Sequence, residues 1–201
     1  MSELPHLRNT VMAFLEADPP LMAIHQIQIR HDETEDRLLL RLSTTDNCEF
    51  RFWLTRRFTK RLWEMLVQML EWDRAVQQQV DPETRHTVLA LQHEGYSQQA
   101  DYTKEFEEHA QGAPRRMLLG EAPVLIAKAE GKRRDEGVQM LSLYPLQGQG
   151  VDITLDTRLL HIFTRLLREQ VVKTDWDVNF ALYDARQETA AAQEGQPRRL
   201  N

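Results

Sequence analysis

A strand that runs directly into a helix is predicted at residues 49–58, which read EFRFWLTRRF. Phe50, Phe52 and Leu54 alternate with more polar side chains, and this period of two is typical of a strand with one buried face. Thr55 then offers a hydroxyl oxygen that can accept a hydrogen bond from an unpaired backbone amide at the start of a helix. The helix itself is predicted from apolar residues at helical spacing, namely Phe58, Leu62, Met65, Leu66 and Met69.

Two more strands are predicted upstream of this segment. Apolar and polar side chains alternate over 21–30 and again over 38–43, and polar turns separate the three strands. Strands joined by such short connections form an antiparallel meander. The first unit of the chain is therefore three strands followed by one helix, which is expected to end near Gln78.

The second half of the chain repeats this pattern. A shift of 101 residues places 38–66 on 139–167 without a gap, with five identities in 29 positions. Strand, turn, strand and apolar helical stripe coincide at this one shift, and Thr55 meets Asp156, another residue type that commonly begins a helix. The coincidence of elements, more than the identities, indicates an internal duplication.

The first strand of each unit fits a shorter shift. In that alignment Ile27 and Ile29 correspond to Val124 and Ile126. The second unit is then expected to carry four extra residues before its second strand, within 130–137.

The predicted fold class is α+β, with two strand-strand-strand-helix repeats, about 21–78 and 117–173, related by a pseudo-twofold axis. A connecting helix is expected over 82–110, because Asp81 and Pro82 are typical of a helix start.

A single domain over 1–183 is expected, because one repeat of about 50 residues would bury little surface by itself. A tail at 184–201 lacks an apolar period and is expected to be disordered. A short helix over 5–17 and an additional strand over 178–182 are also predicted from their apolar spacing.

Composition excludes several classes of protein. The 201 residues include 25 basic and 31 acidic side chains, and this net charge of -6 argues against extensive wrapping by nucleic acid. No apolar run approaches the ~20 residues that a membrane-spanning helix needs, and no secretory signal is recognisable. The single cysteine, Cys48, can form neither an internal disulfide nor a cysteine-based zinc site. A cytoplasmic protein is expected.

No motif for catalysis is recognisable. The glycines form no phosphate-binding loop, and no Gly-x-Ser-x-Gly segment occurs. Glu83 and His86 match half of a di-iron carboxylate signature whose other ligands are missing. The sequence therefore predicts no catalytic residue, no metal and no cofactor, although an enzyme of unrecognised type stays open.

The strongest anomaly is a basic cluster within the 11 residues of 51–61, which contain no acid. Four of its cations fall in the first two turns of the predicted helix, where each is disfavoured by about a few tenths of a kcal/mol. Three explanations stay open: pairing with an acidic stretch of this or a second chain, plain solvation, or an external anion. The acidic stretch comprises Asp101, Glu105, Glu107 and Glu108. The candidate anion- or partner-binding residues are Arg51, Trp53, Arg56, Arg57, Lys60 and Arg61.

Two functions are weighed on this basis. The first is a non-enzymatic protein-interaction or scaffold module that forms a homo-oligomer, most simply a homodimer, because the apolar stripes and candidate exposed Trp63 and Trp72 exceed the needs of one core. The alternative is binding of single-stranded nucleic acid or another anion through 51–61, since arginines beside an aromatic on a sheet suit stacking and backbone contact. The sheet face expected for that role carries Gln26, Gln28, Arg30, Arg41, Arg51 and Trp53.

The segment 49–58, together with the preceding Asp36-Arg37-Leu38-Leu39-Leu40-Arg41, resembles a family of uncharacterised proteobacterial proteins. The resemblance is clearest over about 24–70 and implies no known activity. The layout is also similar to the strand-meander-then-helix repeats of Whirly and Pur-type single-strand nucleic-acid binders, although those repeats have four strands where three are predicted in this chain. Shared layout does not imply shared function.

Overall fold

The computed structural model describes residues 22–100, 106, 109–110, 113–134, 137–178 and 180 of the chain. Its elements follow one another in the order β1 (Met22–Asp32), β2 (Arg37–Thr44), β3 (Cys48–Thr55), α2 (Arg56–Glu71), α3 (Arg74–Gln77), α4 (Pro82–Gln99), β4 (His109–Ala110), β5 (Ala113–Pro114), β6 (Arg116–Met117), β7 (Val124–Arg133), β8 (Val138–Pro145), β9 (Val151–Asp156) and α5 (Thr157–Val172). The predicted α+β class, with two strand-strand-strand-helix units and a helical segment between them, is confirmed.

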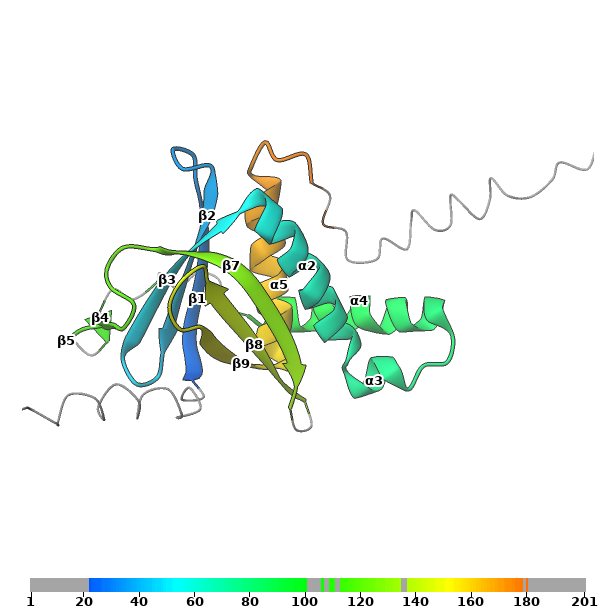
Figure 1. Ribbon diagram of the computed structural model, residues 1–201. Coiled ribbons are helices and arrows are strands. Elements are labelled where there is room, and N and C mark those ends of the chain that lie inside the picture. The colour runs from blue at the N-terminus through cyan, green and yellow to red at the C-terminus, as the bar shows by residue number, and fades with distance from the viewer. Residues whose placement is uncertain are drawn as a thin grey trace, which may run out of the picture.

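Seven strands form one mixed sheet in the order β2-β1-β9-β8-β7-β3-β6, and β2 also pairs with β3. The six long strands therefore close into a ring. Neighbouring strands within each unit are antiparallel, whereas the seams between the units, β1 with β9 and β3 with β7, are short and parallel. Figure 1 shows α2 and α5 side by side against the two meanders.

The two seams occupy equivalent positions in the two units. Phe52 lies opposite Val124 at one seam, and Ile153 lies opposite Met22 at the other. A shift of 101 residues relates Phe52 to Ile153, and a shift of 102 relates Met22 to Val124. The hydrogen-bond register itself therefore follows the approximate twofold.

The first strands of the two units share an irregularity in register. It falls between Ile24 and Gln26 in β1 and between Ile126 and Lys128 in β7. These strands are related by the shift of 102 residues, so the shorter shift expected from the sequence was wrong. The four extra residues expected within 130–137 are not inserted either, because four residues separate β7 from β8, just as four separate β1 from β2.

Close packing explains why the sequence was misleading at this strand. Ile29 of β1 corresponds to Gly131 of β7, where an added Cβ would lie 2.9 Å from Sδ of Met69. Because α2 packs onto β7, the second unit has glycine where the first has a large apolar side chain. An alignment that matches apolar residues therefore places Ile27 and Ile29 on Val124 and Ile126 instead.

Replacing Gly131 with valine should destabilise the fold, because the new side chain overlaps buried Met69 and approaches Trp72. We expect a loss of about 1–3 kcal/mol, the usual cost of overpacking. The measurement is the urea midpoint at unchanged slope. Gly95→Ala in α4 is the control, because no described atom outside the backbone of that helix lies within 4 Å of an added Cβ, and the midpoint should rise. An unchanged midpoint for Gly131→Val would mean that Met69 moves aside without cost.

Each main helix packs against the strands of the other unit. α2 contacts β7, α5 contacts β1, and the two helices contact each other. One continuous cluster of buried side chains draws on both units. Because each helix packs on the strands of the other unit, the apolar stripes of both helices are buried within one chain.

The surplus apolar surface expected from the sequence is largely buried. Trp63 is only 7% exposed, and its ring stacks on that of Phe180 at a centroid distance of 4.7 Å. Trp72 is half-buried. Among the described residues the large exposed apolar side chains are scattered: Val80, Leu91, Leu118, Leu146 and Val172. The homodimer stays a prediction, but apolar surface no longer argues for it.

Two helices end earlier than expected. α2 ends at Glu71 instead of near residue 78, because a new helix begins where Asp73 accepts a hydrogen bond from the Ala75 amide. α4 begins as predicted, with Asp81 as its cap, but ends at Gln99 instead of residue 110. β4 and β5 then pair with each other in a two-stranded ladder.

Several expectations concern residues outside the described part of the chain. They include the helix over 5–17 and the tail over 184–201. Within the expected strand at 178–182, only Val178 and Phe180 are described, and neither belongs to a strand. No helix among the described residues is long and apolar enough to span a membrane.

Candidate functional site

The first two turns of α2 place four cations on one exposed side. The Thr55 hydroxyl accepts a hydrogen bond from the Phe58 amide at 3.2 Å, which starts the helix at Arg56 as the sequence predicted. Phe58 and Leu62 are buried. The exposed positions of these turns form the surface that we call the basic face of α2: Arg56, Arg57, Lys60 and Arg61.

None of these four cations forms an ion pair within the described part of the chain. Their one polar contact with described residues runs from Nη2 of Arg56 to the carbonyl oxygen of Asp177, at 3.4 Å. The first turn of α2 has no acidic residue to offset the partial positive charge of the helix N-terminus. The acidic stretch expected as an internal partner, Asp101, Glu105, Glu107 and Glu108, lies outside the described residues.

Arg51 and Trp53, the other two candidate residues, lie on a different surface. They point to the face of β3 opposite the buried Phe52. Four strand residues, about 13 Å, separate Arg51 from the helix cap at Thr55. The six candidate residues therefore do not form one continuous site.

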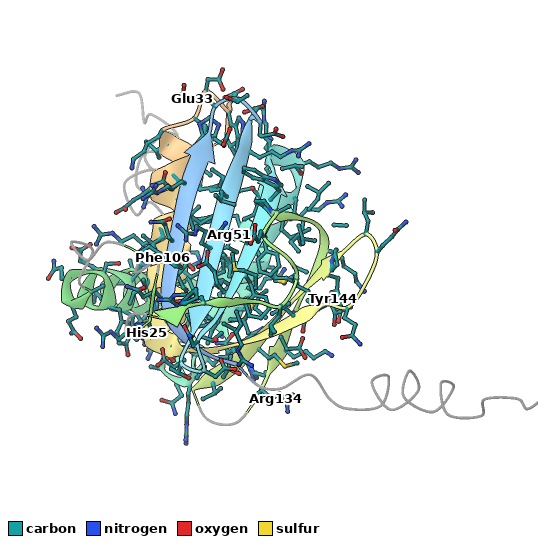
Figure 2. The ribbon with its side chains drawn as sticks, turned by 90° about the vertical axis from the view of Figure 1, so that its left-hand side faces the viewer. His25, Glu33, Arg51, Phe106, Arg134 and Tyr144 are labelled. Atoms are coloured by element: carbon teal, nitrogen blue, oxygen red, sulfur yellow. The ribbon has the colours of Figure 1, made fainter. Side chains whose placement is uncertain are left out.

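Arg51 binds a buried carboxylate that the sequence alone did not single out. Nε of Arg51 lies 2.7 Å from Oε1 of Glu49, and Nη2 of Arg41 lies 2.9 Å from the same oxygen. Glu49 is 2% exposed, and the Arg41 guanidinium also lies over the ring of Phe106 at 4.2 Å. Figure 2 looks onto this face, where Arg51 and Phe106 are labelled over the strands. Internal partners therefore occupy much of the surface considered for nucleic-acid stacking.

The sequence held a signal for this carboxylate. Residues two apart on a strand share a face, so Glu49 must lie beside Arg51. Its position two residues before the basic run excluded it from the window of 51–61. The contribution of Arg41 depends on the register of β2 with β3, in which Arg41 lies opposite Arg51.

The second unit shows how the equivalent helix face is covered. α4 packs across α5, and Nη2 of Arg158 donates to the carbonyl oxygen of Gln99 at 3.3 Å. Nδ1 of His161 lies 3.2 Å from Nδ1 of His93, and the Tyr96 ring stacks on the His161 ring at 5.1 Å. This contact lies on the face of α5 that corresponds, under the internal repeat, to the basic face of α2.

The shift of 101 residues makes Arg57 and Lys60 the counterparts of Arg158 and His161. His161 is completely buried, whereas Lys60 is exposed. The difference arises because α4 covers α5 and no described helix covers the matching face of α2.

Other reactive side chains are arranged as structural residues. Cys48 is buried, and desolvation raises the pKa of its thiol, with the hydrogen bond to Asp46 acting in the same direction. Nη2 of Arg116, 3.2 Å from Sγ, opposes that shift without reversing it. Burial lowers the pKa of His161 to about 4, and the nearby His93 adds to the effect. No group of three His, Cys, Asp or Glu residues in the described ranges could hold a metal ion.

Comparisons with protein-family models, with curated proteins and with solved structures return no match. The resemblance of 24–70 to a proteobacterial family therefore stays untested. The basic face of α2 has to be interpreted from its own geometry and from the internal repeat.

Proposed function

We propose that the protein is a non-enzymatic binding module whose basic face of α2 docks an acidic segment of a partner protein. The observation that carries the proposal is the grouping of four exposed cations that lack a carboxylate partner among the described residues. Like charges this close raise one another's energy, and the helix N-terminus adds to that cost. An acidic segment relieves both contributions.

The geometry favours a protein over a single-stranded nucleic acid. Binders of single strands combine cations with aromatic rings on which bases stack. The exposed positions of α2 carry no aromatic side chain, because Trp63 is buried against Phe180. Arg51 is bound to Glu49, and Trp53 lies on that same separate face of β3.

The double substitution Arg57→Ala and Arg61→Ala should weaken binding of a labelled oligo-glutamate peptide about tenfold, because each lost charge contact contributes roughly 0.5–1 kcal/mol. Fluorescence anisotropy at low and high salt measures the affinity. The fold should survive, since both side chains are exposed and have no described partner.

Arg158→Ala with Arg168→Ala is the matched control, because both positions are exposed on α5 and the net charge changes equally. We expect this control to bind the peptide as the wild type does. Equal affinities for the Arg57/Arg61 variant and the wild type would refute the proposal. Tighter binding of labelled oligo-thymidine than of the peptide, lost in the same variant, would favour the nucleic-acid alternative instead.

A further inference from the structure

We infer that the basic face of α2 is also the docking site of the chain's own residues 184–195, lying across α2 as a helix in the way that α4 lies across α5. This inference uses the surface of the proposed function but does not depend on an external partner. Four observations lead to it.

The first observation is the twofold arrangement of the units. α4 follows the helix of the first unit and covers the helix of the second. Applying the shift of 101 residues to α4 gives 183–200, which follows α5 and would cover α2. The approximate twofold of the fold therefore predicts a helix over the basic face of α2.

The second observation is the path of the chain after α5. Phe180 stacks on Trp63 of α2 with an interplanar angle of 3°, and the Asp177 carbonyl accepts a hydrogen bond from Arg56. The chain thus reaches α2 four residues before Asp184. Four residues span at most about 14 Å, so the segment begins next to the basic face.

The third observation is the composition of the segment. Asp184 suits a helix start, Gly195 and Pro197 suit a helix end, and the residues between are mainly Ala, Gln and Glu, which favour helix. Its missing apolar period had predicted disorder. α4 shows that this argument is insufficient, because Leu89 and Ser97 are its only buried residues and it still packs on α5.

The fourth observation is complementary charge at equivalent positions. Residues 184–195 hold three acids and one arginine, opposite the four cations of α2. The same shift relates His93 to Glu194 and His161 to Lys60. Where α4 and α5 bring two histidine rings together, the equivalent contact on α2 pairs Glu194 with Lys60.

Backbone amide hydrogen exchange in the full-length chain at low salt tests this pairing. We expect the amides of 185–194 to exchange about tenfold or more slowly than in an unstructured peptide of the same sequence. Lys60→Glu should abolish the protection, and the double reversal Lys60→Glu with Glu194→Lys should restore it. Lys173→Glu, an exposed position at the end of α5, changes the net charge equally and should leave the protection intact.

Exchange of 185–194 at the unstructured rate in the wild type would overturn the inference, and so would protection that Lys60→Glu leaves unchanged. Binding of the oligo-glutamate peptide in either case would still support the proposed function. Protection restored by the double reversal without peptide binding would support the inference and refute the function. If both hold, added peptide should displace the segment and accelerate its exchange.

Discussion

Replacing Glu49 with alanine should lower the free energy of unfolding by about 3–5 kcal/mol, the usual consequence of removing one partner from a buried ion pair. Glu49 lies between two guanidinium groups, and its side chain is 2% exposed. Arg41 retains only 10% of its side-chain exposure, so water cannot replace the lost carboxylate. The measurement is the urea midpoint at constant slope.

Glu130→Ala provides a matched control for this experiment. Glu130 also lies between two cations on a strand, Lys128 and Lys132, but its side chain is 35% exposed and both lysines are mostly exposed. Water can solvate the lysines after the substitution, so the midpoint should stay unchanged.

A double-mutant cycle of Glu49→Gln with Arg41→Met isolates the interaction between the two groups. The double variant should be less destabilised than the sum of the single variants, because each single variant already loses the contact between the two side chains. Additive losses, or equal midpoints for Glu49→Ala and Glu130→Ala, would contradict the stabilising role of the buried network.

Local chemistry made most of the fold predictable. Alternation over the strands and the helix caps at Thr55, Asp81 and Asp156 are all confirmed. The repeat was correct for the second and third strands and the helix, where equivalent positions carry side chains of similar size. It failed at the first strand because Gly131 is adapted to Met69 of α2, and no local pattern reports a contact between distant elements.

The candidate site was predictable as a group of charges but not as a surface. The exposed positions of Arg56, Arg57, Lys60 and Arg61 follow from helical spacing and from the buried stripe beside them. Separation of Arg51 from these cations depends on its strand face and on Glu49. The burial of Trp63 depends on Phe180, which lies more than a hundred residues further along the chain.

Stability should fall by about 3 kcal/mol between pH 6.5 and pH 4 because of His161 alone. Burial lowers the pKa of His161 from 6.5 to about 4, and the charge of His93 lowers it further, while Asp73 acts weakly in the opposite direction. The unfolded chain therefore binds a proton in this range that the folded chain does not. The contribution of His161 to stability is fully present above its pKa in the unfolded chain, and it is lost as the pH falls toward its pKa in the folded chain.

The surroundings of His161 explain why its charged form is disfavoured. Its Nδ1 faces His93, its ring lies against Tyr96, and its Nε2 has no hydrogen-bond partner among the described residues. A charged imidazole needs acceptors for two N–H groups, and no carboxylate of the described residues is hydrogen-bonded to either nitrogen. The pKa of His93 is also lowered, first by burial and then by Arg168 and Arg165. Protonation of His93 at low pH therefore also opposes folding.

His161→Leu should flatten the dependence of stability on pH in this window, as measured by urea midpoints at several pH values. The slope is the relevant quantity, because the substitution also changes packing against Tyr96 and shifts stability at every pH. Carboxylates whose pKa is lowered in the folded chain, such as Asp81 beside the Thr84 amide, also lose stabilisation below about pH 5, but equally in both variants, so the difference between the slopes reports on His161. An unchanged slope in His161→Leu would mean that the contact between α4 and α5 opens before His161 is protonated.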